Sequence, residues 1–257
     1  MIPKIIHYCW FGRKPLPPLA VICIGSWKRF FPEYEIKEWN EDNFDVTQTR
    51  YTKEAYEAKK FAFVSDYARF WVLYKYGGIY FDTDVEVIKP MDDIIGHGSF
   101  MGCENECGKG IALKVNPGLG LGANPGHKFY KEMLDVYGTM TFLLPNGMYN
   151  QTTVVKYTSK VLVKYGLKNQ NNIQEVSGIT IYPKEYFCPY NYVTKRLEIT
   201  EQTRAIHHYM ASWKSGWEKR MLHLWVPLTY KCPWLADSVK KLYSMVFSMC
   251  HSHFYCK

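Results

Sequence analysis

The feature that most constrains this chain is a short apolar strand that ends in two acidic residues. Ile79-Tyr80-Phe81 runs directly into Asp82-Thr83-Asp84, and the preceding Gly77-Gly78 is a typical helix stop. Two carboxylates one residue apart at the end of a buried strand form a compact oxygen site suited to a hard divalent cation. Because an unpaired buried carboxylate is costly, we expect a cation beside them, either a metal ion or Arg69.

The segments around this motif predict an α/β fold. Residues 4–10 and 34–39 have the composition of strands, and residues 19–32 repeat apolar side chains at helical spacing. Strand, helix, strand in that order, with polar exits, is typical of a parallel sheet. We expect further helices at 51–76, 128–137 and 151–165, strands at 79–81, 85–88, 99–104, 110–115, 179–182 and 204–209, and a glycine-rich loop at 118–126.

The predicted helix before the acidic strand carries polar residues of its own. Ser65 and Asp66 precede Arg69 by four and three residues, so all three lie on one side of the helix, away from its mostly apolar face. Taken alone, Asp66 and Arg69 could be a simple helix ion pair. Their position just ahead of the acidic strand makes them candidates for the same site.

The charge of the chain is concentrated near its C-terminus. Of the net charge of +8, residues 203–257 contribute eight Lys and Arg against two Asp and Glu. We expect one domain over residues 1–230 and a basic amphipathic helical tail at 231–257. The tail could dock on the domain or lie on an anionic membrane. Nucleic acid is not an expected partner, since no nucleic-acid-binding module is recognisable in the sequence.

The N-terminal residues do not have the pattern of a secretory signal, and no stretch is apolar enough to span a membrane. We therefore expect a cytoplasmic protein, with a peripheral place on the inner face of the plasma membrane if the tail binds lipid. The eight cysteines are then expected to be free thiols.

Three blocks of the sequence resemble one enzyme family. Phe63 to Asp84 closely resembles the DXD sugar-binding region of family 32 glycosyltransferases, which include bacterial capsular polysaccharide enzymes and fungal α-1,6-mannosyltransferases. Residues 2–12 resemble the opening strand of that family, and residues 207–213 resemble its closing block. The resemblance implies a GT-A fold with a Rossmann-like, mostly parallel sheet flanked by helices, and transfer that retains the anomeric configuration.

The resemblance also implies cofactor and donor residues. A nucleotide-sugar donor would be held with Mn²⁺ or Mg²⁺, for which Asp84 would be a direct ligand, Asp82 a ligand partly through water, and His208 the third ligand. Asp66, Arg69, Asp82 and Asp84 are the implied catalytic residues. The implied donor-binding residues are Trp10 (stacked on the base), Asn40, Ser65, Asp66, Arg69, Tyr80, Asp82, Ser212 and Trp213.

The acceptor side matches the family less well. Relatives often carry a Gly-Pro pair ahead of the late helix, where this chain has residues 145–152 without that pair. Asn150 and Gln151 could present amides to the reacting sugar. The expected acceptor is a saccharide, lipid-linked in one version of the hypothesis.

The sequence therefore predicts a hexosyltransferase that uses a UDP-sugar, of the UDP-galactose or UDP-glucose type, in surface or capsular polysaccharide biosynthesis. A mannosyltransferase that uses GDP-mannose is an alternative within the family. Outside it, an aspartyl-phosphate phosphohydrolase also begins from Asp-x-Asp after a strand, but Glu86 stands where such enzymes carry Thr or Val. A sugar-nucleotide-binding module without turnover is the non-enzymatic alternative.

Overall fold

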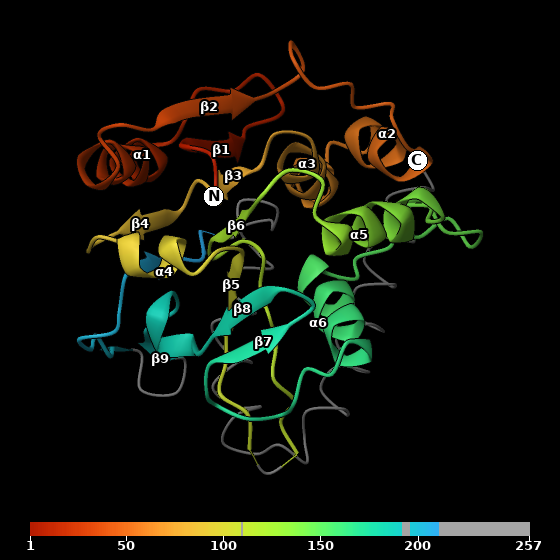
Figure 1. The fold of residues 1–257 in the computed structure, drawn as a ribbon. Coiled ribbons are helices and arrows are strands. Elements are labelled where there is room, and N and C mark those ends of the chain that lie inside the picture. Colours follow the sequence, from red (N-terminus) through yellow and green to blue (C-terminus); the bar gives the residue numbers. More distant parts are fainter. Residues whose placement is uncertain (109, 192–195, 211–257) are drawn as a thin grey trace. The chain divides into compact units, whose positions relative to one another are not determined.

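The computed structural model describes residues 1–108, 110–191 and 196–210 (Figure 1). Its helices are α1 (Pro18–Phe30), α2 (Arg50–Glu57), α3 (Phe61–Tyr76), α4 (Asp92–Gly96), α5 (Lys128–Gly138), α6 (Val154–Lys164) and the 3₁₀ turn η1 (Lys184–Tyr186). Its strands are β1 (Ile5–Cys9), β2 (Glu35–Trp39), β3 (Gly78–Tyr80), β4 (Val85–Val87), β5 (Phe100–Gly102), β6 (Leu121–Ala123), β7 (Gln174–Val176), β8 (Ile179–Tyr182), β9 (Tyr190–Asn191), β10 (Arg196–Leu197) and β11 (Ala205–His207).

A seven-stranded sheet in the order β2-β1-β3-β6-β5-β8-β7 forms the centre of the fold (Figure 1). The strands β1, β2, β3, β5 and β8 run in one direction, and β6 and β7 run in the other. This confirms the predicted α/β class and the mostly parallel central sheet. The two short ladders β11-β4 and β9-β10 are antiparallel and separate from this sheet.

The sheet is apolar on both faces, as a largely parallel sheet covered on both sides requires. On β3 and just after it, Ile79 and Phe81 join one buried cluster while Tyr80 joins the other. Helix α3 packs against α2, α5 and the strands β1, β3 and β6, whereas α1 packs against β4. The acidic turn therefore begins at the end of a strand whose side chains are buried on both sides.

Three expectations about elements were wrong in detail. The helix expected over 51–76 is two helices, because the chain turns at Lys59, whose φ is 57°. Residues 110–115 form only isolated bridges at Ile111 and Val115. The glycine-rich loop at 118–126 contains β6, where a Cβ on Gly122 would lie 2.4 Å from the ring of Phe100. Glycine there permits the close approach of strand and ring.

The tail at 231–257 and its boundary after residue 230 lie outside the described residues, and both stay predictions. Among the described helices, none combines the length and the apolar character that crossing a membrane would require. The described cysteines, Cys9, Cys23, Cys103, Cys107 and Cys188, carry free thiols as expected.

A buried histidine ties β1 to the turn between α3 and β3. The Trp39 indole N–H donates to Nδ1 of His7 over 3.0 Å, so His7 Nε2 carries the proton and donates to the Gly77 carbonyl over 2.9 Å. Burial lowers the pKa of His7 to about 4, although the bond to Gly77 opposes that shift. The neutral imidazole therefore fixes the point at which the chain enters the strand that carries the acidic turn.

We expect this histidine to make stability depend on pH. Above the ordinary pKa of 6.5, His7 is neutral in both the folded and the unfolded chain. Between 6.5 and about 4 only the unfolded chain takes up the proton, so the free energy of unfolding should fall, by up to about 3 kcal/mol across this window. Urea unfolding of the wild type and of His7→Gln at pH 7 and pH 5 measures the effect. Equal pH dependence in the two proteins would contradict it.

Candidate active site

Three neighbouring parallel strands end at the same edge of the sheet. Trp10 follows β1, Asn40 follows β2 and Asp82 follows β3, and β1 pairs in parallel with both of the others. The Trp10 backbone N–H donates to the Trp39 carbonyl over 2.9 Å, which continues the pairing past the strand ends. In open α/β sheets, ligands bind beyond the carboxyl ends of the strands. The fold thus places Trp10, Asn40 and the acidic turn after neighbouring strands. The Trp10 indole N–H donates to the Lys14 carbonyl over 2.6 Å, and the Asn40 side chain bonds to Glu38 and to the Asp42 N–H.

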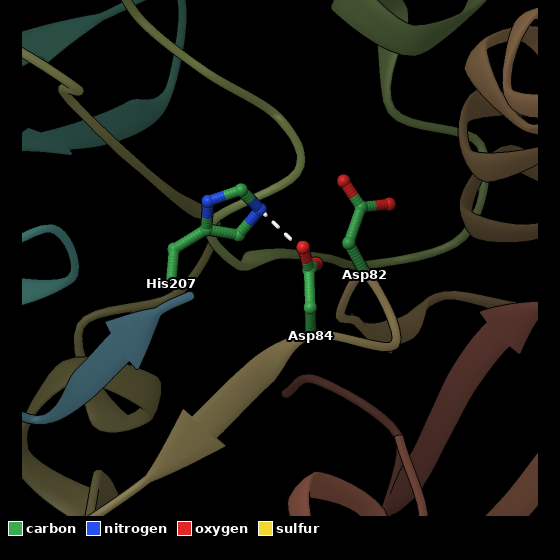
Figure 2. Close-up of side chains that lie close together, drawn as sticks. All are labelled: Asp82, Asp84 and His207. Atoms are coloured by element: carbon green, nitrogen blue, oxygen red, sulfur yellow. Dashed lines mark ion pairs between the residues drawn. The ribbon is translucent and has the colours of Figure 1, made fainter. Parts of the chain in front are cut away.

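A histidine from the far end of the described chain completes the acidic turn. Strand β11 pairs antiparallel with β4 and sets His207 opposite Val85, next to Asp84. His207 Nε2 lies 3.2 Å from Asp84 Oδ1. Figure 2 shows the imidazole directed at Asp84, with the Asp82 carboxylate on the other side of Asp84. One ligand atom from each of these three residues lies within 4.8 Å of the other two.

Arg69 links helix α3 to the acidic turn. Its Nη2 lies 3.0 Å from Asp66 Oδ1 and 3.2 Å from Asp82 Oδ1, and its guanidinium carbon lies 5.1 Å from the centre of the Tyr80 ring. The side chain is only 4% exposed. The Tyr80 hydroxyl also donates to Asp82 Oδ1, over 3.1 Å. Asp82 Oδ1 is therefore fixed by two donors, which leaves Oδ2 for another ligand.

The two carboxylates of the turn have different environments. Burial raises the pKa of Asp82, against the effect of Arg69. Burial also acts on Asp84, but the neighbouring His207 and the Met210 backbone N–H, which donates to Asp84 Oδ2 over 2.7 Å, outweigh it and hold the pKa of Asp84 at about 2. Asp84 is therefore a carboxylate at any physiological pH.

Asp66 and His207 have raised pKa values for different reasons. Burial raises the pKa of Asp66 to about 7 despite the nearby Arg69. Burial alone would lower the pKa of His207, but the charge of Asp84 outweighs it and raises that pKa. Perturbed carboxylates and imidazoles gathered at one place are typical of functional sites.

The start of the glycine-rich loop predicted at 118–126 forms one wall of the site. The Asp82 backbone N–H donates to the Gly118 carbonyl over 3.2 Å, and a Cβ on Gly118 would lie 2.1 Å from Asp82 Oδ2. Asn116 Oδ1 accepts from the Gly118 N–H over 2.7 Å, and Asn116 Nδ2 donates to Glu104 over 3.0 Å. Glycine is therefore needed at 118 to make room for the carboxylate. The run of glycines was the only sequence signal of this role.

The donor set of Asp82, Asp84 and His207 fits a divalent cation. Carboxylates suit Mn²⁺ and Mg²⁺, and the imidazole nitrogen favours the transition-metal ion of the two. His207 Nδ1 is buried and has no hydrogen-bond partner among the described residues. The ring nitrogen that interacts with Asp84 is therefore Nε2. A cation there would replace the proton that now lies between the imidazole and the carboxylate.

The third member of this cluster is His207 and not the expected His208. His208 Nε2 lies 2.9 Å from Glu86 Oε2, and its backbone N–H donates to the Asp84 carbonyl over 2.9 Å. Neighbouring residues of a strand point to opposite faces, so only one of the two histidines can face the acidic turn.

The other predicted residues are placed as follows. The Ser65 hydroxyl donates within its own helix to the Phe61 carbonyl over 3.2 Å, and the Ser65 carbonyl accepts from Arg69 Nε over 3.1 Å. Asn150 bonds locally, to the Tyr157 hydroxyl and the Thr152 N–H, and Gln151 is exposed. Ser212 and Trp213 lie outside the described residues. Their roles stay predictions.

Residues 17–101 match the family model described as the glycosyltransferase sugar-binding region containing a DXD motif. The match covers the DXD region on which the resemblance predicted from the sequence depends, over about a third of the chain. Among relatives, inositol phosphoceramide mannosyltransferase 3 of Schizosaccharomyces pombe is 28% identical over 141 residues, which cover 52% of this chain and 36% of that protein. An uncharacterised glycosyltransferase of Acanthamoeba polyphaga mimivirus is 27% identical over 207 residues, which cover 74% and 78%.

The matched stretch spans about a third of the length of the S. pombe mannosyltransferases. Among solved structures, the glycosyltransferase involved in glycosylation of the major capsid of PBCV-1 has a TM-score of 0.46 at 12% identity and covers 82% of this chain and 95% of its own. The PaToxG glycosyltransferase has a TM-score of 0.46 at 18% identity and covers 63% and 69%.

The two adjacent histidines allow a matched test of the ligand set. We expect His207→Ala to weaken Mn²⁺ binding by more than about tenfold, because it removes a nitrogen that faces both carboxylates. His208→Ala should bind Mn²⁺ like the wild type. Isothermal titration with MnCl₂ compares the three proteins. A larger loss of Mn²⁺ affinity in His208→Ala than in His207→Ala would show that His208 is the third ligand.

Gly118→Ala tests the wall of the site. The added methyl group must displace the Asp82 carboxylate, so Mn²⁺ affinity should fall by about tenfold or more while the fold is kept. Gly25→Ala is the control, because a Cβ on that exposed helical glycine meets nothing within 4 Å. Unchanged Mn²⁺ affinity in Gly118→Ala would show that Asp82 Oδ2 is not a ligand atom.

Proposed function

We propose that this chain transfers a hexose from a nucleotide sugar to a saccharide acceptor, with a divalent cation held by Asp82, Asp84 and His207. The observation that carries the proposal is the convergence of these three side chains at the edge where β1, β2 and β3 end. The match of residues 17–101 to the DXD sugar-binding region supports it independently.

The chemistry of glycosyl transfer explains the composition of the site. As the sugar leaves a nucleoside diphosphate, positive charge grows on the sugar and negative charge grows on the departing phosphate. A divalent cation bound here would stabilise that phosphate as a Lewis acid. Carboxylates alone would repel the diphosphate, which is why we treat Asp82 and Asp84 as cation ligands.

We assign the remaining residues by their geometry. Trp10 follows β1, which lies in the sheet between β2, the strand before Asn40, and β3, the strand before Asp82. Its side chain is partly exposed, so its ring can stack on the nucleobase. Arg69 is too deeply buried to neutralise a diphosphate directly and instead positions Asp66 and Asp82. Asp66, with its pKa near 7, can exchange hydrogen bonds with a hydroxyl of the transferred sugar.

The donor has two candidates. A UDP-hexose is our first assignment, with retention of configuration and a role in surface polysaccharide biosynthesis, as the family resemblance implies. GDP-mannose is the second, because the two S. pombe relatives are named mannosyltransferases. Their names also specify inositol phosphoceramide, a lipid that carries a polar head, which supports a lipid-linked acceptor for this chain as well.

The phosphohydrolase alternative requires Asp82 to act as a nucleophile. Here Arg69 and Tyr80 both bind Asp82 Oδ1, while Gly118 lies against Oδ2. With Oδ1 held by two donors and ligand atoms of Asp84 and His207 within 4.8 Å, this carboxylate is better suited to share a cation than to attack phosphorus. We therefore keep the glycosyltransferase as the proposed function.

Hydrolysis of UDP-galactose, UDP-glucose and GDP-mannose, each with Mn²⁺ and with excess EDTA, tests this function. We expect one donor to be hydrolysed only with Mn²⁺, and Asp84→Asn to lower that rate by more than about 100-fold because the variant loses a charged ligand. Asp45→Asn, an exposed change in a local turn, is the control. Preference for GDP-mannose would select the second donor, and undiminished rates in EDTA would contradict the proposal.

A further inference from the structure

A glutamate that follows β5 lies at the same edge of the sheet as the acidic turn. Strand β5 runs in the same direction as β3, and Glu104 comes two residues after its end. The Glu104 side chain is only 20% exposed. Its Oε2 accepts from Asn116 Nδ2 over 3.0 Å, while its Oε1 lies 4.0 Å from the Lys114 ammonium, which is 54% exposed. Ion pairs with an exposed lysine are weak, so the bond to Asn116 is the stronger of these two contacts.

The main chain of Glu104 is anchored in the central sheet. Its N–H donates to the Lys114 carbonyl over 2.9 Å. The preceding Cys103 bridges Val115, and the Cys103 N–H donates to the Tyr182 carbonyl on β8 over 2.9 Å. The carboxylate therefore projects from a backbone that neighbouring segments hold in place.

The two hydrogen bonds of the Asn116 side chain determine how its amide is oriented. Oδ1 accepts from the Gly118 N–H over 2.7 Å, and Nδ2 donates to the Glu104 carboxylate. A backbone N–H can only donate and a carboxylate can only accept. Rotating the amide by 180° would therefore oppose two donors at Gly118 and two acceptors at Glu104. Glu104 thus sets the orientation in which Asn116 holds the Gly118 N–H.

Gly118 passes this constraint to the acidic turn. Its carbonyl accepts from the Asp82 N–H over 3.2 Å, and a Cβ at this position would lie 2.1 Å from Asp82 Oδ2. Arg69 and Tyr80 hold the other carboxylate oxygen, Oδ1. The position of Asp82 Oδ2 therefore depends on where the backbone of Gly118 lies.

We propose that Glu104 is a positioning residue for the cation site, because it orients Asn116, which fixes the Gly118 backbone against Asp82. This inference rests on the proposed function, in which Asp82 is a cation ligand. Glu104 acts here as a hydrogen-bond acceptor, so its negative charge is not required. A carboxylate that attracted the cation by charge, or one that only stabilised the fold, would respond differently to substitution.

Amide hydrogen exchange of the full chain without metal, measured by NMR, tests the hydrogen-bonded chain directly. Glu104→Ala should raise the exchange rates of the Gly118 and Asp82 N–H groups by about fivefold or more, because Asn116 loses the partner that orients it. Glu104→Gln should recover most of this loss, because glutamine keeps an acceptor oxygen. The Trp10 N–H, which donates to the Trp39 carbonyl at the same sheet edge, is the internal reference and should not change.

Asn116→Asp supplies a second variant. It places a carboxylate oxygen against Glu104, so the Gly118 and Asp82 N–H groups should again exchange faster. Adding Glu104→Gln should restore slow exchange, because the glutamine N–H can donate to the new carboxylate. Glu106→Ala is the matched control, since this glutamate of the same loop is exposed. It should leave both exchange rates as in the wild type.

Isothermal titration with MnCl₂ relates these variants to the cation site. Glu104→Ala should weaken Mn²⁺ binding by about tenfold or more, and Glu104→Gln should recover most of that affinity. Equal losses in the two variants would assign the effect to charge, and faster exchange at Trp10 as well would assign it to fold stability. Either result, or an unchanged exchange rate in Asn116→Asp, would overturn the proposal.

The two measurements separate this inference from the proposed function. Hydrogen exchange requires neither metal nor donor, so it decides whether Glu104 holds the Gly118 backbone even if the wild type binds no Mn²⁺. Absence of Mn²⁺ binding by the wild type would instead contradict the proposed function.

Discussion

A buried arginine shared between two carboxylates organises this site. Arg69 reaches from α3 to Asp66 on its own helix and to Asp82 on the acidic turn, and almost none of it is exposed to water. Removing one member of such a group leaves a buried charge without compensation, at a cost of about 3–5 kcal/mol. The position of Asp82 therefore depends on how α3 ends and β3 begins. His7 fixes that turn through Gly77, and Gly78, whose added Cβ would lie 2.5 Å from a β1 carbonyl, permits it.

The acidic turn gains its histidine from a different constraint. The pairing of β11 with β4 brings a residue more than a hundred positions away to Asp84. Arg69 thus compensates the negative charge of Asp82, and the His207 imidazole compensates that of Asp84. These partners reduce the repulsion between the two neighbouring carboxylates. Only the second of these partners is itself a good metal ligand. A cation would therefore bind between Asp84 and His207, while Arg69 stays paired with Asp82.

The sequence predicted those parts of the site that are local in the chain. Strand, glycine stop and acidic pair were recognisable because each signal lies within a few residues of the next, and helical spacing was enough to place Asp66 and Arg69 together. The choice between His207 and His208 depends on the register of two distant strands, which alternation alone cannot fix. The helix ends near Lys59, whose positive φ is not signalled by a glycine or a proline. Strand β6 was not predicted because its glycine, which permits close packing, is also typical of loops. These features are set by tertiary contacts.

The proposed function requires that Asp82, Asp84 and His207 coordinate one divalent cation that also holds a nucleoside diphosphate. A crystal structure of the full chain soaked with MnCl₂ and UDP tests it most directly, because anomalous scattering locates manganese without ambiguity. We expect one ion in direct contact with Asp84 Oδ1 and His207 Nε2, with the diphosphate on its open side near Trp10. Manganese bound elsewhere, or a diphosphate bound away from these side chains, would contradict it.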